Sequence, residues 1–192
     1  GLSVYSMPIG GSTAVGALGY LVGFVELMHD LRRRALDPVA VVFTSSSGGT
    51  HAGLVAGRAW YRATHPDERL PDIIAIGVAK GVVSGLPSIA DLARETLRVA
   101  GLPGDVDDRD AVIDPRWLGD DYAVPTVHSK AAGSWAATRG AWVLDDVYTA
   151  KGMSGLLGLE AEGRFGDRDV VFIHTGGHPE VFVRGGMGNS HG

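Results

Sequence analysis

A short loop rich in hydroxyl groups and glycine contains the residue types in this chain that best suit anion binding. It consists of Ser47, Gly48, Gly49 and Thr50, and it follows an apolar run at Val39–Phe43 that is typical of a buried strand. A helix pattern comes next, so main-chain N–H groups, the helix dipole and hydroxyls would face one anion. Because glycine lacks a Cβ, the main chain can approach that anion closely. The loop predicts a phosphate site; an ordinary strand-to-helix connection of the same composition is the alternative.

Other groups of ionisable residues carry weaker signals. No lysine follows the loop glycines, so the loop is not a nucleotide-binding P-loop and suits the phosphate of a bound cofactor better. His174 and His178 have the spacing of metal ligands on a helix, but two glycines and a proline around them argue against a helix. The acidic run between Pro103 and Pro115 lacks the spacing of a calcium loop and is expected to be solvated. We therefore expect no metal site.

The composition indicates one globular domain and excludes several function classes. The chain has 192 residues, of which 45% are hydrophobic and 20% charged, and a net charge of −5. Arg32–Arg34 is the only basic cluster, which argues against nucleic-acid binding. Without cysteine there is no disulfide and no thiol nucleophile. The apolar stretch Val15–Leu27 is too short to cross a bilayer, so we expect no membrane association and a cytoplasmic protein.

Apolar runs that alternate with helix patterns predict an α/β fold. Strands are expected at Val4–Ile9, Val39–Phe43, Asp72–Ala79, Trp142–Leu144 and Val170–His174. Helices are expected from Thr13 to Ala35, Thr50 to Ala63, Pro87 to Val99, Ser129 to Arg139 and Gly152 to Ala161. Such strands form a three-layer, mostly parallel sheet with helices on both faces. Ligands bind beyond the carboxyl ends of these strands, where the Ser47–Thr50 loop and the Thr175–Gly177 turn would converge. Residues 185–192 are expected to form a flexible tail.

Four segments in the same order resemble the D-cysteine desulfhydrase / 1-aminocyclopropane-1-carboxylate deaminase family. They are Pro8–Thr13 with Gly16–Tyr20, Ser47–Leu54, Asp145–Met153 and Phe172–Gly177. The family consists of pyridoxal-phosphate enzymes of fold type II, and the resemblance implies that residues 1–184 are a portion of the large domain.

The resemblance also implies a cofactor and the residues that bind it. The cofactor would be pyridoxal 5′-phosphate, with the Ser47–Thr50 loop on its phosphate and Thr175 near its pyridine nitrogen. Thr149 and Gly176 would complete the cofactor-binding set. A neutral hydroxyl beside that nitrogen would leave it largely unprotonated, which suits rapid expulsion of a β-leaving group.

Tyr148 and Tyr122 resemble active-site tyrosines of the family and are the implied catalytic residues. A phenol could orient a substrate carboxylate, or transfer a proton if its pKa were lowered. A tyrosine packed at a strand end with a satisfied hydroxyl is the alternative for both. Deaminases carry Glu directly after the first tyrosine, and here Thr149 stands there.

This difference favours β-elimination from a small sulfur-containing amino acid such as D-cysteine or L-cysteate. The products would be pyruvate, ammonia and sulfide or sulfite. The alternatives are a 1-aminocyclopropane-1-carboxylate deaminase and a non-catalytic subunit that binds the cofactor or serves assembly.

The family's cofactor-binding lysine lies near its N-terminus in an Asn-Lys-x-Arg-Lys context, ahead of a smaller domain. No such segment occurs here, and Lys80, Lys130 and Lys151 match no such motif, so each is expected at the surface or in packing. The resemblance therefore implies the C-terminal part of a longer enzyme: a fragment, a processed chain or one half of a split enzyme. The missing part would supply the lysine, and the complete enzyme would be a homo-oligomer, most simply a dimer.

Overall fold

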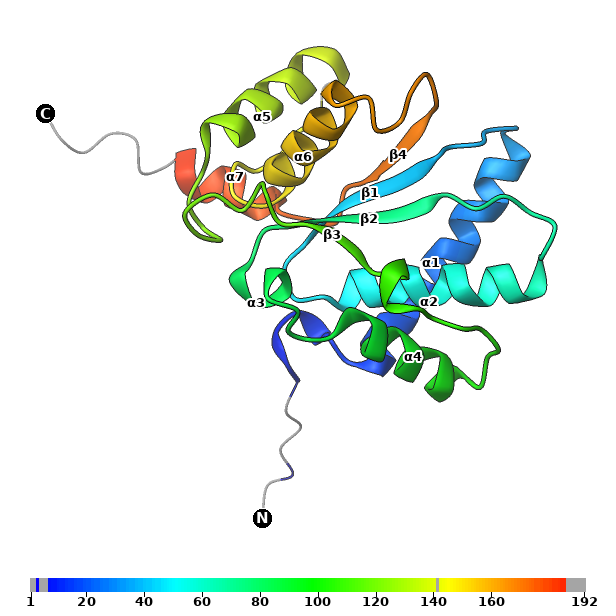
Figure 1. The fold of residues 1–192 in the computed structure, drawn as a ribbon. Coiled ribbons are helices and arrows are strands. Elements are labelled where there is room, and N and C mark those ends of the chain that lie inside the picture. The colour runs from blue at the N-terminus through cyan, green and yellow to red at the C-terminus, as the bar shows by residue number, and fades with distance from the viewer. Residues whose placement is uncertain (1–2, 4–6, 141, 186–192) are drawn as a thin grey trace, which may run out of the picture.

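A four-stranded parallel sheet forms the middle layer of the molecule. The computed structural model describes residue 3, residues 7–140 and residues 142–185. The strand order is β3-β2-β1-β4, and the strands are β1 (Ala40–Ser45), β2 (Asp72–Gly77), β3 (Val112–Asp114) and β4 (Val170–Ile173). Ala40 of β1 lies between Asp72 and Val170, and all four strands run in the same direction (Figure 1).

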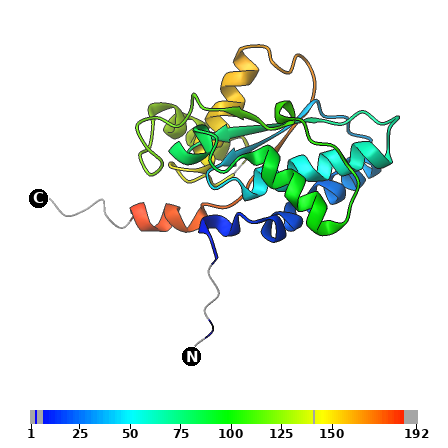
Figure 2. The same ribbon diagram turned by 60° about the horizontal axis from the view of Figure 1, so that its bottom comes forward.

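Helices cover both faces of this sheet (Figures 1 and 2). One face carries α1 (Ala14–Arg33), α2 (Gly49–Thr64) and α4 (Ile89–Ala100), and the other carries α5 (Val127–Gly140) and α6 (Thr149–Ala161). The short elements are η1 (Ile9–Gly11), α3 (Lys80–Val83), η2 (Asp108–Asp110) and α7 (His178–Gly185). The predicted three-layer α/β fold is confirmed.

Alternate residues of β1 supply the cores on the two sides of the sheet. Val41 and Phe43 pack with α1, α2 and α4, whereas Ala40 and Val42 face the α6 side. Glycines bring the helices close together: a Cβ on Gly57 of α2 would lie 2.7 Å from Phe24 Cβ of α1. The chain has 29 glycines among its 192 residues, and they serve close packing as well as turns.

Capping residues fix several helix ends where the sequence predicted them. The Thr13 hydroxyl accepts a hydrogen bond from Gly16 N at 3.0 Å and begins α1. Gly101 ends α4 with a φ of 65°, in the left-handed region. Ser88 is the N-cap of α4, so Pro87 precedes this helix and does not lie in its first turn as predicted.

Some predicted elements are absent and others were missed. The predicted strand Val4–Ile9 lies partly outside the described residues, and its described end begins the η1 turn instead. Trp142–Leu144 is not a strand, because this short apolar run finds no pairing partner among the described residues. The acidic segment contains β3, and α7 begins at His178 with Pro179 in its first turn, which proline tolerates. The predicted tail 185–192 lies outside the described residues except for Gly185.

α1 is longer than the apolar stretch in the sequence indicated. By length and composition this 20-residue helix could cross a membrane, contrary to the expectation from Val15–Leu27 alone. Its buried face packs against α2 and α4, as in the core helix of a globular domain.

Candidate functional site

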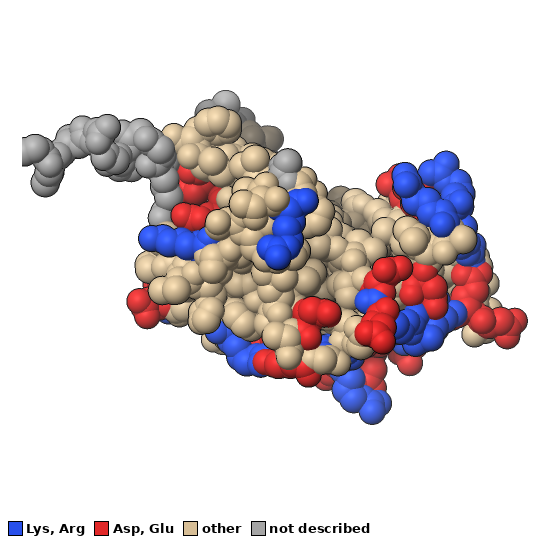
Figure 3. Space-filling model, turned by 90° about the horizontal axis from the view of Figure 1, so that it is seen from above, with Lys and Arg blue, Asp and Glu red and all other residues tan. Residues whose placement is uncertain are grey.

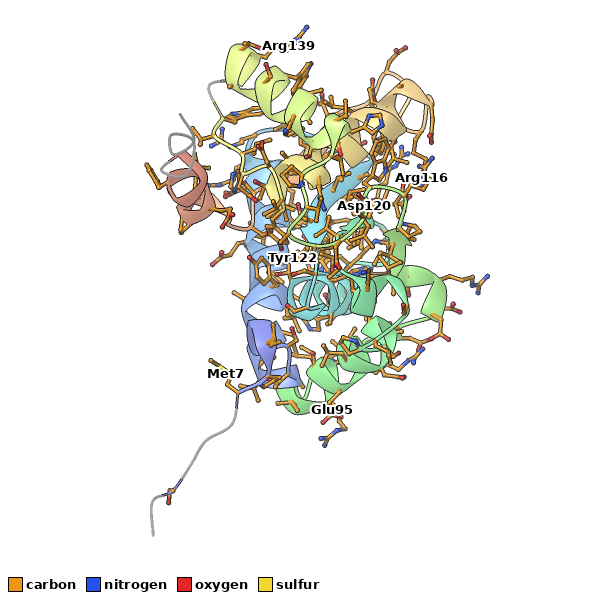
Figure 4. The ribbon with its side chains drawn as sticks, turned by 90° about the vertical axis from the view of Figure 1, so that its left-hand side faces the viewer. Met7, Glu95, Arg116, Asp120, Tyr122 and Arg139 are labelled. Carbon is orange, nitrogen blue, oxygen red and sulfur yellow. The ribbon has the colours of Figure 1, made fainter. Side chains whose placement is uncertain are left out.

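A cavity of about 390 Å³ lies at the carboxyl ends of the strands. Its lining comes from segments far apart in the sequence and includes Gly10, Ser46, Ser47, Thr50, Tyr122, Asp145, Tyr148, Thr175, Gly177 and Glu180. The loops after β1 and β4 therefore converge on one cavity. Figure 4 faces this end of the sheet, with Tyr122 near its centre and Arg139 at the far end of α5.

Ser46, Ser47 and Thr50 in the segment after β1 line the cavity, whereas Gly48 and Gly49 are not among its lining residues. Ser47 and Thr50 line the cavity, whereas Gly48 caps α2 with a φ of 92°. A Cβ on Gly48 would lie 2.8 Å from Ile89, and Gly49 N–H donates to Ser12 Oγ at 3.2 Å. The turn and the packing against neighbours thus favour glycine at both positions.

The donors at this loop fit a phosphate group. Ser46, Ser47 and Thr50 bring three hydroxyls to the N-terminus of α2, a helix of 16 residues. The first N–H groups of a helix have no intrahelical acceptor, and the helix dipole favours an anion there. A neighbouring hollow of about 660 Å³ shares Ser46, Ser47 and Tyr122 and extends toward Pro8 and Pro87. The combined space has a polar end for a phosphate and an apolar wall for a ring.

Tyr148 is fixed in place by two groups at the ends of strands. Its hydroxyl donates to the Thr44 carbonyl at 3.0 Å and lies 3.2 Å from Thr175 Oγ1. Burial raises the pKa of the Tyr148 phenol above its ordinary value, and the hydrogen bond with Thr175 opposes this only in part. Tyr148 is therefore a neutral hydroxyl at neutral pH.

Tyr122 faces Tyr148 from the loop after β3. The two ring centroids are 6.4 Å apart, and Tyr122 remains 42% exposed. Burial raises the pKa of the Tyr122 phenol, and the negative charges of Asp145 and Glu180 raise it further. The lowered pKa that a proton-transferring phenol would need is present in neither tyrosine. Tyr122 is suited to donating a hydrogen bond to a ligand, whereas the Tyr148 hydroxyl already donates its proton to the Thr44 carbonyl.

Comparisons with known proteins agree with the motifs. No protein-family model matches the chain. The chain is 32% identical over 191 residues to a D-cysteine desulfhydrase of Serratia proteamaculans, covering 95% of this chain and 53% of that protein. It is 31% identical to a D-cysteine desulfhydrase of Klebsiella pneumoniae, with the same coverage. A crystal structure of an ACC deaminase homologue superposes with a TM-score of 0.78 at 27% identity, covering 95% of this chain and 52% of that one.

The resemblance to this family is confirmed. The chain spans about half the length of the desulfhydrases that it matches. Of the family's implied site residues, Ser47, Thr50, Tyr122, Tyr148 and Thr175 line the cavity.

Thr149 and Gly176, two residues of the desulfhydrase-like motifs, are not among the residues that line the cavity. The Thr149 hydroxyl is buried and donates to Asp145 Oδ1 at 2.7 Å. Gly176 has a φ of 126°, and its N–H donates to His174 Nδ1 at 3.4 Å. His174, in the loop after β4, stacks on His178, the first residue of α7, with ring centroids 4.4 Å apart. The described residues contain no group of three metal ligands.

Asp145 is a cavity residue that sequence reasoning missed. Its carboxylate is 2% exposed and accepts the N–H groups of Val147, Tyr148 and Thr149 at 2.7–3.1 Å. A Cβ on Gly177 would collide with the same carboxylate. The sequence signal that could have identified Asp145 is its position four residues ahead of Thr149, the first residue of α6. Glu180 was also missed, because α7 was not predicted.

The three lysines of this desulfhydrase-like chain do not line the cavity. Lys80 pairs with Asp121 at 2.7 Å on the surface, and Lys130 is exposed. Lys151 is fully buried, and its Nζ donates to three carbonyls, those of Leu118, Asp121 and Tyr122, at 2.6–3.2 Å. Lys151 is thus a packing lysine that holds the loop carrying Tyr122.

Proposed function

We propose that this chain is the large-domain portion of a pyridoxal-phosphate-dependent lyase. The reaction is β-elimination from a small sulfur-containing amino acid such as D-cysteine or L-cysteate, giving pyruvate, ammonia and sulfide or sulfite. The supporting observation is the cavity at the carboxyl ends of the strands, where three hydroxyls meet the N-terminus of α2. The likeness to D-cysteine desulfhydrases supports the reaction class.

Different residues of the cavity bind the cofactor phosphate and face the substrate. Ser46, Ser47 and Thr50 hold the phosphate together with N–H groups in the first turn of α2 other than that of Gly49, which donates to Ser12. When bound, the cofactor supplies an electron sink for the substrate's Cα electrons. Tyr148, anchored to the Thr44 carbonyl, presents a neutral hydroxyl beside Thr175.

Tyr122 reaches the cavity from the opposite wall and shields one side of the bound substrate from water. Its position depends on Lys151, whose ammonium group holds the surrounding carbonyls. The raised pKa keeps the Tyr122 phenol protonated, so it can donate a hydrogen bond to a substrate carboxylate.

A lysine for the cofactor must come from outside this chain, because none of its lysines reaches the cavity. The proposed activity therefore requires the complementary half, by which we mean the half of the relatives' length that this chain does not span. We infer that the active form is an oligomer of the completed fold.

Keto-acid assays with the complementary half supplied test this proposal. D-cysteine and L-cysteate should yield pyruvate, and 1-aminocyclopropane-1-carboxylate should yield little 2-oxobutyrate. Preferential formation of 2-oxobutyrate would overturn the assignment and favour a deaminase, the second candidate, which the likeness to an ACC deaminase homologue supports. Cofactor binding without any keto acid would favour the non-catalytic subunit.

A further inference from the structure

A serine just ahead of α1 lies against the loop that the proposed function assigns to the phosphate. Ser12 lines the hollow of about 660 Å³ beside the cavity, and its Oγ accepts the Gly49 N–H at 3.2 Å. Gly49 is the first residue of α2, so its N–H has no acceptor within the helix. Ser12 therefore takes up a donor that would otherwise be available to an anion at this helix N-terminus.

The main chain fixes Ser12 in this position. Its φ of −74° and ψ of 71° are those of an inverse γ-turn, which a hydrogen bond from Thr13 N to the Gly11 carbonyl closes at 2.7 Å. Thr13 is itself the N-cap of α1. The Ser12 hydroxyl is thus held between the start of α1 and the start of α2.

Ser12 stands beside a hydroxyl of the phosphate loop. A Cβ on Gly10 would lie 3.3 Å from Ser12 Oγ and would collide with Ser47 Oγ. The two hydroxyls therefore lie next to the same glycine. Because Ser47 lines both the cavity and the hollow, Ser12 is close to the place where the two spaces meet.

The Ser12 hydroxyl keeps a proton that it can donate. A serine oxygen that accepts an N–H still carries its own O–H, and among the described residues this O–H has no acceptor. No lysine or arginine is among the described residues that line either space, so neutral donors must hold an anion there. On the α5 and α6 face in Figure 3, charged side chains gather most densely toward the right, the side on which the strands begin in Figure 1.

We propose that Ser12 is a further phosphate-binding residue of this site and relays the Gly49 N–H to the anion. The Gly49 N–H donates to Ser12 Oγ, and the Ser12 O–H donates to a phosphate oxygen. Consecutive hydrogen bonds of this kind polarise and strengthen one another. Gly49 then contributes to anion binding although its N–H donates to a serine. This role rests on the proposed function, because it requires the phosphate to lie at the N-terminus of α2.

Binding of inorganic phosphate to the 192-residue chain, measured by calorimetry, tests the proposal. Ser12→Ala should weaken the phosphate affinity by about fivefold or more, because a hydrogen bond to a charged group is lost. Ser12→Thr keeps the hydroxyl and should retain most of the affinity. Ser88→Ala is the matched control and should bind phosphate like the unmodified chain. Ser88 also accepts a main-chain N–H at a helix start, that of Asp91 at 3.3 Å, but lines neither space.

An unchanged or higher affinity of Ser12→Ala would overturn the proposal, because Ser12 would then only hold the Gly49 N–H away from the anion. A second measurement needs no variant. In the unmodified chain, phosphate should shift the amide resonance of Gly49 and leave that of Asp91 in place, and a Gly49 resonance that does not move would also overturn the relay. Phosphate binding involves no turnover, so the relay can fail while the keto-acid assays still support the proposed function.

Discussion

At the scale of single residues, the Asp145 carboxylate organises the start of α6. It accepts three N–H groups and the Thr149 hydroxyl in a buried setting. We predict that Asp145→Ala lowers the free energy of unfolding by about 2–4 kcal/mol, because buried donors lose a charged acceptor. Asp145→Asn keeps one acceptor oxygen and should lose less. Urea unfolding of both variants measures this, and equal losses would contradict the assigned role.

The buried Lys151 ammonium group donates hydrogen bonds to three main-chain carbonyls, which take the place of water. Lys151→Ala should leave these carbonyls without a cation and destabilise the chain by about 3 kcal/mol. Ammonium chloride should restore part of that stability, whereas tetramethylammonium chloride, whose cation is too large and donates no hydrogen bonds, should not. Lys130→Ala, at an exposed lysine, is the control and should respond to neither salt. Equal responses of the two variants would refute a specific cation site.

His51 is a buried histidine directly after the Ser47–Thr50 loop. Neither ring nitrogen has a hydrogen-bond partner, and burial lowers its pKa to about 3. The unfolded chain binds a proton near pH 6.5, so the stabilising contribution is complete above that pH and is lost as the pH falls toward 3. Between pH 7 and pH 5 the free energy of unfolding should fall by about 2 kcal/mol. His51→Leu should abolish this slope in pH-dependent urea titrations, and a variant of the exposed His29 should keep it.

The family motifs identified residues that line the cavity, but they did not identify the contacts that each residue makes. Ser47, Tyr122, Tyr148 and Thr175 could be found from short motifs, because each stands in a recognisable local pattern. The role of Lys151 could not be found from a motif, because the carbonyls that accept its hydrogen bonds lie about 30 residues away in the sequence. Only the folded chain brings these groups together.

At the scale of elements, glycine spacing sets how closely α2 packs on α1. We predict that Gly57→Ala destabilises the chain by about 1–3 kcal/mol, because its Cβ would lie 2.8 Å from the Leu21 carbonyl oxygen. Gly19→Ala is a matched control within α1, with no atom within 4 Å of the new Cβ, and should stabilise by about 0.4–1 kcal/mol. Thermal unfolding of both variants checks the signs. If both variants changed the stability in the same direction, helix propensity and not close packing would determine the effect of Gly57→Ala.

Long periodic elements were predictable, and short ones were not. α1, α2, β1 and β2 follow from apolar patterns and capping residues, since local signals and burial agree there. β3 has only three residues in an acidic segment, and its pairing with β2 is not local. The strand predicted at Trp142–Leu144 is absent for a different reason. Its apolar residues line a cavity and do not join the sheet.

At the scale of the whole molecule, the fold gathers the candidate site residues at one end of the sheet. Hydroxyls from the loop after β1, both tyrosines and Thr175 meet at one end of the sheet, while the lysines lie elsewhere. The parallel strand order explains the convergence, because every strand delivers its following loop to the same end.

The proposed function predicts that this chain alone binds pyridoxal phosphate without a defined covalent attachment. After borohydride reduction in the presence of the cofactor, peptide mapping should find well below one label per chain, scattered over accessible amines. Lys151 should remain unlabelled because it is buried. Inorganic phosphate should compete for the noncovalent binding, since both anions use the N-terminus of α2. When the complementary half is added, a single stoichiometric label should appear on that half. A stoichiometric label on Lys80, Lys130 or Lys151 would instead show that this chain supplies its own lysine.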